Sequence, residues 1–459
     1  MAELERQDIQ GLTMSGYAHL PCASYLLLRV ADAPAARGWL ARLVDQITTS
    51  ERKQEGFSVN VAFTRHGLAH LGLDATTLDT FSRPFVEGMT TPHRSRILGD
   101  ANENAPSWWE WGGSDEEKAV DILLLLFGED EGTLDSLLRE HKGRFAQGGL
   151  TEFRALGAGR QPDHHEHFGF ADGMGQPVIE GSPQADKALP GDLIKAGEVL
   201  LGYINDYGKP AVSPLVPPTL DPQGILPGTG ELGRNGTYLV FRQLAQNVAD
   251  FWRFFDEATS DPDEQPDRAA SVRLAAKCVG RWPSGAPLVL SPDADDPTLK
   301  EENDFGYYEK DVHGFACPIG SHIRRANPRD SLGPDPKTAL ASANRHRILR
   351  RGRSYGKRAA DPRVDDNIER GLFFICLNSD IERQFEFVQQ TWLNNPVFGG
   401  LSGEVDPIVG HLVKGDEIFT EQADPLRRRV HDLRRFVTVK GGAYFFLPGV
   451  RALRYIASL

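Results

Sequence analysis

The chain has 459 residues, of which 40% are hydrophobic, 25% charged and 9% aromatic, a composition typical of a soluble globular protein. At this length two or three domains are expected. The net charge of −13 would repel phosphate backbones and anionic lipids, so nucleic acid and membrane surfaces are not expected as partners.

The cysteines and the N-terminal residues predict the compartment. Cys22, Cys278, Cys317 and Cys376 form no CxxC pair, which argues against zinc, iron–sulfur clusters and covalently attached haem. Buried free thiols in a reducing compartment are the expectation. The N-terminus, MAELERQDIQ, lacks the basic and apolar stretches of a secretory signal, and the longest apolar run, 122–127, is too short to cross a bilayer. We therefore expect a cytoplasmic protein.

The first third of the chain alternates between the hydrophobic periodicities of strands and helices. Strands are predicted at 23–30, 59–63, 119–127 and 150–156. Between them, two helical stripes are formed by Trp39, Leu40, Leu43, Val44 and Ile47, and by Leu134, Leu137 and Leu138. The resulting order, β-α-β-β-α-β, is typical of a ferredoxin-like unit.

The C-terminal half repeats this pattern without obvious sequence identity to the first. Strands are predicted at 238–241, 347–350, 372–377, 436–439 and 443–447, with helical stripes at 244–255 and 381–392. Between the halves, residues 181–236 are rich in proline and glycine, which indicates a long irregular connection.

The predicted fold class is therefore α+β, with two ferredoxin-like units built on antiparallel sheets, as in dimeric α+β barrels. We expect an N-terminal unit at 1–180, a connection at 181–236 and a C-terminal unit at 237–459.

Asp172 lies in a glycine-rich segment, His167-Phe-Gly-Phe-Ala-Asp-Gly-Met-Gly-Gln-Pro177. Glycines on both sides of the acid allow a tight turn and a close approach to a flat ligand. Taken alone, Asp172 is better explained as a turn-forming aspartate without chemistry.

His322 follows a Gly/Pro-rich approach and precedes two arginines, Arg324 and Arg325. A lone histidine is more often structural than a ligand. The basic pair would suit the two propionates of a haem, although two solvated surface arginines remain an alternative.

Arg350 ends the predicted strand 347–350, where it shares a face with Ile348. An inward-facing arginine beside an aliphatic residue needs an anion or a polar ligand. A solvated basic edge strand is the alternative.

Together these segments resemble the dye-decolourising peroxidase family. Asp172 lies in a GxxDG motif, Gly169-Phe-Ala-Asp-Gly173, and Cys317-Pro-Ile-Gly-Ser-His322-Ile-Arg-Arg resembles the family's proximal-histidine segment. Ile348-Leu-Arg350 resembles its distal-arginine segment, and the stretch from Gly371 to Asp380 resembles the strand that follows. The motifs occur in the family's order over nearly the whole chain, and the length and N-terminus resemble its longer, non-exported branches.

The resemblance implies a peroxidase with one haem b, which reduces hydrogen peroxide and oxidises dyes, phenols or other small aromatic donors. His322 would be the proximal iron ligand and Asp380 the acid bonded to its other ring nitrogen. Asp172 would move the peroxide proton, and Arg350 would stabilise charge as the O–O bond breaks.

The remaining expected roles also follow from the resemblance. Leu372 and Phe374 would narrow the distal pocket, so that bulky donors reach the haem only through the protein. Tyr355 resembles a surface tyrosine used for such electron transfer, although an ordinary packed tyrosine is as good an explanation. Candidate haem contacts are Gly173, Gln176, Arg324 and Arg325.

Two other classes of function remain open at this point. A haem-handling protein without turnover could use the same fold. A metal-dependent hydrolase could use His164, His165, His167 and Asp172, but the spacing matches no recognised metal motif. A homo-oligomer is also left open.

Overall fold

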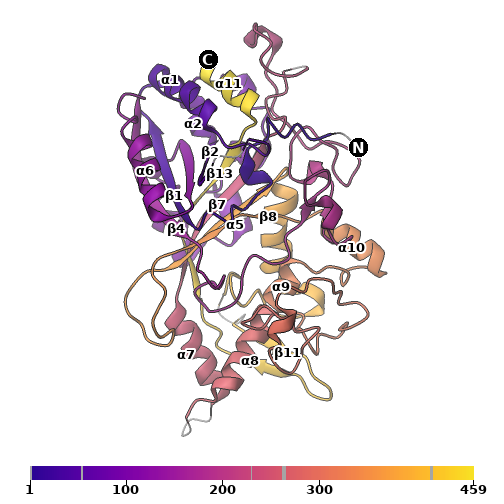
Figure 1. The fold of residues 1–459 in the computed structure, drawn as a ribbon. Helices are drawn as coiled ribbons and strands as arrows, with labels where there is room; N and C mark the ends of the chain where they lie inside the picture. The colour runs from indigo at the N-terminus through magenta and orange to yellow at the C-terminus, as the bar shows by residue number, and fades with distance from the viewer. Residues whose placement is uncertain (1–2, 53–54, 229, 261–264, 414–416) are drawn as a thin grey trace.

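The main sheet closes into a barrel. The computed structural model describes residues 3–52, 55–228, 230–260, 265–413 and 417–459. Within this part of the chain, nine strands follow the order β7-β13-β2-β3-β1-β4-β9-β10-β8, and β7 also pairs with β10 (Figure 1). The strands are β1 (Cys22–Val30), β2 (Phe57–Phe63), β3 (Ile122–Gly128), β4 (Leu150–Gly159), β7 (Thr237–Gln246), β8 (Leu349–Arg350), β9 (Arg353–Tyr355), β10 (Gly371–Asn378) and β13 (Val437–Leu447).

Helices cover the outside of the barrel and its lower end in Figure 1. Most begin at a side-chain cap, such as Asp32, whose carboxylate accepts the Ala35 amide at the start of α1. The α-helices are α1 (Ala33–Leu43), α2 (Arg65–His70), α3 (Ala75–Leu78), α4 (Arg83–Glu87), α5 (Pro92–Leu98), α6 (Glu131–Lys142), α7 (Val248–Thr259), α8 (Arg268–Val279), α9 (His322–Ala326), α10 (Pro336–Asn344) and α11 (Val450–Ser458).

Each half of the barrel has the strand order of a ferredoxin-like unit, which confirms the predicted fold class. In the first half β2, β3, β1 and β4 are neighbours in that order, and every pair is antiparallel. In the second half β13, β7 and β10 are neighbours, and β10 pairs with the short strands β8 and β9. The halves join where Phe446 pairs with Phe63 and Gly159 with Ser354.

Two predicted elements of the second half differ in the structure. The strands expected at 436–439 and 443–447 are one strand, β13, whose register shifts between Val439 and Gly441. The helix expected at 381–392 consists of two π-helical segments, η10 (Glu382–Glu386) and η11 (Val388–Leu393). Its wider winding is seen in the bond from the Glu386 amide to the Ile381 carbonyl.

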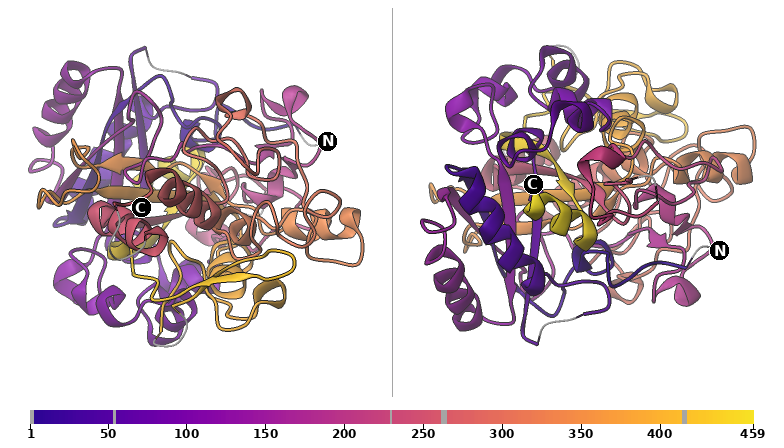
Figure 2. Two further views of the ribbon diagram at one scale, coloured as in Figure 1. Left: turned by 90° about the horizontal axis from the view of Figure 1, so that it is seen from below. Right: turned by 90° about the horizontal axis from the view of Figure 1, so that it is seen from above.

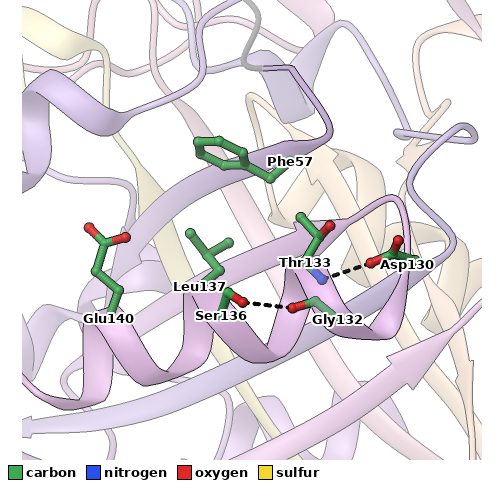
Figure 3. A pocket seen from close by; sticks show the side chains of 7 residues that line it. All are labelled: Phe57, Asp130, Gly132, Thr133, Ser136, Leu137 and Glu140. Carbon is green, nitrogen blue, oxygen red and sulfur yellow. Dashed lines mark hydrogen bonds between the residues drawn. The ribbon is translucent and has the colours of Figure 1, made fainter.

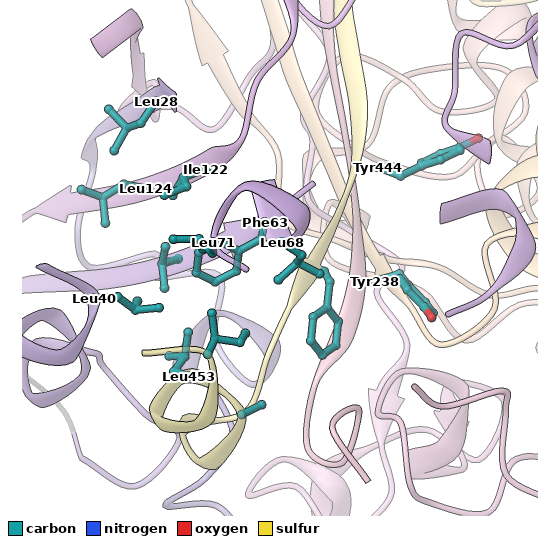
Figure 4. Packing of buried hydrophobic residues seen from close by; sticks show 14 of the residues in the cluster. Leu28, Leu40, Phe63, Leu68, Leu71, Ile122, Leu124, Tyr238, Tyr444 and Leu453 are labelled. Atoms are coloured by element: carbon teal, nitrogen blue, oxygen red, sulfur yellow. The ribbon is translucent and has the colours of Figure 1, made fainter. Parts of the chain in front are cut away.

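Both faces of the sheet are buried, because strand residues alternate between two cores. Tyr25, Leu125, Phe241, Phe373 and Phe445 point into the barrel, where they form one apolar cluster. On the outer face of the first half, Leu40, Leu68 and Leu453 come from α1, α2 and α11 and pack over Ile122, Leu124 and Phe63 (Figure 4).

The long segment between β4 and β7 is irregular. It contains the two-stranded sheet of β5 (Val178–Ile179) and β6 (Leu193–Ile194) and several 3-10 turns. A further two-stranded sheet, β11 (Phe419–Glu421) with β12 (Arg428–Val430), lies beside α8 near the bottom of Figure 1. In the described part of the chain, no helix has the length and apolarity that crossing a membrane requires.

Candidate active site

Asp172 ends a small hairpin in the irregular segment between β4 and β5. Its amide bonds to the His164 carbonyl at 3.0 Å, and His165 pairs with Ala171. Gly173 has a φ of +92°, a conformation that L side chains rarely adopt, so the chain turns directly after the acid. The Asp172 side chain keeps 43% of its surface exposed. The acid is therefore held by its backbone while its carboxylate stays open to a small molecule.

Arg350 reaches Asp172 from the C-terminal half. Its Nη1 lies 3.7 Å from Asp172 Oδ1, and its Nη2 donates to the Met174 carbonyl at 2.6 Å. Its backbone amide donates to Gln176 Oε1 at 3.0 Å. The predicted pair is therefore brought together, and the Gln176 side chain holds the backbone at Arg350.

The expected pocket residues share the outer sheet face with Arg350. Arg350 lies opposite Cys376, and cross-strand partners point to the same side of an antiparallel sheet. Phe374 and Leu372 follow on that face at two-residue spacing, and both are partly exposed, whereas Phe373 between them points into the barrel.

His322 begins α9 and faces a buried carboxylate. Its Nδ1 lies 2.9 Å from Oδ2 of Asp406, which is fully buried. The other oxygen of Asp406 accepts the amides of Ile408 and Val409 at 2.9 and 2.8 Å. With Nδ1 occupied, Nε2 points away from Asp406, and 29% of the His322 side chain remains accessible. This geometry fits a neutral imidazole that offers Nε2 to a metal.

The pKa values of His322 and Asp406 are shifted by each other's charge. Burial lowers the pKa of His322, but the charge and hydrogen bond of Asp406 outweigh it, so the pKa is raised overall. The charge of Arg350 lowers the His322 pKa and that of Asp172 raises it, and both effects are smaller than that of Asp406. Burial raises the pKa of Asp406, but His322 and the Val409 amide reverse that effect and leave it lowered.

Asp380 was expected as the partner of His322, and this prediction is wrong. Asp380 precedes η10, where its carboxylate accepts the Arg383 amide at 3.1 Å and pairs with the Arg383 guanidinium at 3.4 Å. It therefore helps to begin a helix. Nothing in the sequence around Asp406 distinguishes it from other turn aspartates, so sequence reasoning missed it.

Arg324 and Arg325 were expected to meet propionates, and the structure contradicts this as well. The Arg324 guanidinium bonds to Asp311 and to the Cys317 carbonyl. Arg325 is fully buried and donates to the carbonyls of Gly320, Trp392, Asn395 and Glu404. Both arginines hold protein segments around His322 and do not point to an open surface.

Tyr355 lies on the other face of the sheet from Leu372 and Phe374. Its ring stacks on Phe373 with a centroid distance of 4.4 Å, and its hydroxyl donates to Glu369 at 3.3 Å. Burial, followed by the charge of Glu369, raises its pKa. The tyrosine is partly exposed, so its ring extends from the barrel interior to the surface.

The histidines next to the Asp172 hairpin do not form a metal site. His165 bonds to Asp163, while His167 Nε2 contacts the Tyr355 carbonyl at 2.8 Å. Among the described residues, no group of three or more potential metal ligands gathers anywhere. The four cysteines are free, and three of them are buried, as expected.

A hollow of about 550 Å³ lies elsewhere, over α6 and the start of β2 (Figure 3). In it the Thr133 amide donates to Asp130, the cap of α6, and the Ser136 hydroxyl donates to the Gly132 carbonyl within that helix. None of its lining residues belongs to the site described above, so it is not the place of the chemistry.

The chain is similar to known proteins over nearly its whole length. No model of a protein family matches the chain. It is 31% identical to a dye-decolorizing peroxidase of Mycena epipterygia over 95% of this chain and 84% of that protein. It is also similar to the solved structure of an ancestral D-type dye-decolorizing peroxidase, with a TM-score of 0.80 and 28% identity over 99% of both chains. A dye-decolorizing peroxidase in complex with 2,6-dimethoxyphenol has a TM-score of 0.80 and 27% identity, over 99% of this chain and 100% of that one.

Proposed function

Because this chain belongs to the dye-decolourising peroxidase family, and is therefore a hydrogen-peroxide-dependent oxidoreductase, we propose that Asp172, Arg350 and His322 carry its reaction. Peroxide would be reduced between the Asp172–Arg350 pair on one side and His322 on the other. The observation that carries this proposal is the pairing of Asp172 with Arg350 at 3.7 Å, because the two residues come from different halves of the sequence. It is supported by the bond between His322 Nδ1 and Asp406, which leaves Nε2 free to bind a metal.

Members of this family depend on haem, and we propose one haem b for this chain. His322 would hold the iron through Nε2, because Asp406 engages Nδ1 at 2.9 Å and fixes the orientation of the ring. The anionic partner raises the basicity of the imidazole, which favours an electron-rich metal. When bound, the haem would supply the iron to which peroxide binds and the electrons that break its O–O bond.

Asp172 would transfer the peroxide proton. In the ionised form its carboxylate would accept a proton from one oxygen of peroxide and then donate it to the other oxygen, which leaves as water. Arg350, with Nη1 3.7 Å from this carboxylate, would stabilise the negative charge on the separating oxygen. Per peroxide, two electrons and two further protons complete the reduction to two water molecules.

Donors of these electrons are proposed to be small aromatic molecules and dyes. A relative of this chain was solved with 2,6-dimethoxyphenol, a phenolic compound. Leu372 and Phe374 would restrict the distal space to peroxide, and Gly173 would allow close approach of the haem edge. Bulky donors would then deliver electrons at the surface, where Tyr355 is the proposed contact. We also propose a cytoplasmic location, and unit boundaries at residues 180 and 236.

The optical spectrum of the purified protein tests the cofactor assignment. We expect a Soret band that changes on addition of hydrogen peroxide and returns when 2,6-dimethoxyphenol is added. His322→Ala should lose haem or show a changed ferric spectrum, because the iron loses its protein ligand. A variant with unchanged haem content, spectrum and turnover would show that another residue binds the iron.

A further inference from the structure

Glu166 is a partly buried carboxylate inside the hairpin that ends at Asp172, and the reaction described above does not use it. Its Oε1 accepts the Phe170 amide at 2.9 Å, and its Oε2 accepts the Phe168 amide at 2.8 Å. Gln246, at the end of β7, donates its side-chain amide to Oε2 at 2.6 Å. One side chain thus satisfies two backbone amides and joins the hairpin to the barrel.

The backbone of the hairpin closes around this carboxylate. The Glu166 amide donates to the Phe170 carbonyl, and the Gly169 amide donates to the Glu166 carbonyl, both at 2.9 Å. Gly169 has a φ of +96°, which lets the chain reverse at this point. Directly after the turn, the Asp172 amide bonds to the His164 carbonyl. The path of the chain into Asp172 is therefore set within a few residues of Glu166.

The outer side of the hairpin is anchored to α7. The Phe168 ring stacks on Phe251 with a centroid distance of 4.2 Å, and Trp252 Nε1 donates to the Phe168 carbonyl at 3.1 Å. Phe170 lies parallel to Trp252, with 6° between the ring planes. Since the aromatic rings hold one side and Glu166 the other, the loop has little freedom to shift Asp172.

We propose that Glu166 is a positioning residue for Asp172, which holds the amides of Phe168 and Phe170 so that the Asp172 carboxylate faces Arg350. This inference rests on the proposed role of Asp172. It is supported by the pKa of Glu166, which burial and then the charge of Asp172 raise to about 7. The two carboxylates are therefore close enough to interact, although only Asp172 contacts Arg350.

The variant Glu166→Gln tests the proposal in the haem-loaded enzyme. The amide group of glutamine would turn a donor toward one of the two backbone amides, so one hydrogen bond is lost and the hairpin shifts. A shift of about 1 Å in a reacting group can cost about 100-fold in rate. We expect kcat/KM for hydrogen peroxide to fall at least fivefold, with kcat/KM for 2,6-dimethoxyphenol within twofold of the parent value.

Asp8→Asn is the matched control. Asp8 is also buried and accepts a backbone amide, that of Arg451, and the side chain of Asn235, but it lies near α11. Its variant should leave both constants unchanged in the folded enzyme. A general loss of stability would lower both constants in proportion, whereas a positioning role lowers only the peroxide constant.

Gln246→Leu provides a second measurement, because it removes the third hydrogen bond and leaves the carboxylate in place. We expect a selective twofold or larger fall in the peroxide constant. If Glu166→Gln does not fold with haem, the peroxide constant of Gln246→Leu alone tests the proposed positioning role. Unchanged or proportionally lowered constants in the variants that fold would overturn the proposal. If the parent protein itself does not react with peroxide, the proposed function fails together with this inference, an outcome distinct from a reactive parent with equally reactive variants.

Discussion

The two sides of the site differ in how firmly the protein holds its polar groups. Asp172 and Arg350 are 3.7 Å apart and keep 43% and 36% of their side-chain surfaces exposed. His322 and Asp406 are 2.9 Å apart, and Asp406 has no exposed surface. A group that meets a new molecule in every cycle must stay accessible, whereas a group that orients a permanent ligand gains from burial.

The surroundings show the same contrast. Around His322, the guanidinium of Arg325 links α9 to the Glu404 carbonyl, two residues before Asp406. Around Asp172, the support comes from backbone bonds of one hairpin and from Glu166. Substitutions on the Asp172 side should therefore change single chemical steps, and those on the His322 side should change the properties of the bound metal.

The largest effect is expected for Asp172→Asn, which keeps the shape of the side chain but cannot accept the peroxide proton. The rate constant for reaction with hydrogen peroxide should fall by about 10²–10⁴, measured by stopped-flow absorbance, with haem content unchanged. Asp163→Asn is the control, because Asp163 lies in the same segment between β4 and β5 but pairs with Arg358. A loss smaller than tenfold would exclude Asp172 as the proton carrier.

A smaller effect is expected for Asp406→Asn, which removes the negative charge beside His322. Loss of such a partner of a metal-bound histidine costs about 10–100-fold in metal affinity or activity. The ferric/ferrous midpoint potential should also rise, because a less basic imidazole donates less charge. Asp380→Asn is the matched control, and both its potential and its rate should equal those of the parent. Equal shifts in the two variants would contradict the assignment of Asp406.

The pH dependence of stability provides a third comparison. Glu166 has a folded pKa of about 7 against an ordinary 4.5, so the folded state retains a proton that the unfolded state releases between these values. Its contribution to stability is present below pH 4.5 and is lost as the pH rises to about 7. The parent should lose about 2 kcal/mol more than Glu166→Gln between these pH values, by chemical denaturation, after allowance for partial exposure. Parallel curves would show that Glu166 has an ordinary pKa.

The smallest effect is expected for Tyr355→Phe, which keeps the stacking on Phe373 and removes only the hydroxyl. Oxidation of a bulky dye should slow by about two- to fivefold, with the peroxide rate unchanged, because only the surface route loses a redox-active group. Tyr308→Phe serves as the control, since Tyr308 is an exposed tyrosine at another place. A rate of dye oxidation equal to that of the parent would show that Tyr355 takes no part in electron transfer and serves only in packing.

Much of the fold could be predicted because most of the barrel strands carry local signals. Val59, Val61 and Phe63 alternate along β2, and the apolar run in β3 is buried on both faces. The sequence predicts two strands where the structure has β13 alone, because Lys440-Gly441-Gly442 interrupts the hydrophobic alternation at the bulge. The π-helical winding of η10 and η11 leaves no distinct periodicity that could separate it from an α-helix.

The site was less predictable wherever it depends on contacts between distant segments. Asp172 and Arg350 could be paired because both lie in recognisable motifs. Asp406 could not be assigned to His322, since it comes from a turn much later in the chain and carries the same local pattern as many aspartates. The arginines after His322 lie in a helix of only five residues, where spacing alone does not tell the buried face from the exposed one.

The position of α11 has a consequence for synthesis on the ribosome. This helix packs against α1, as the upper part of Figure 1 and the right-hand view of Figure 2 show. Its Leu453 and Ile456 belong to the apolar cluster on the outer face of the first half. The helix emerges only after every strand of the barrel has been made. The outer apolar face of the first half therefore stays uncovered until α11 has been synthesised, and exposed apolar surface of this kind makes a nascent chain prone to aggregation.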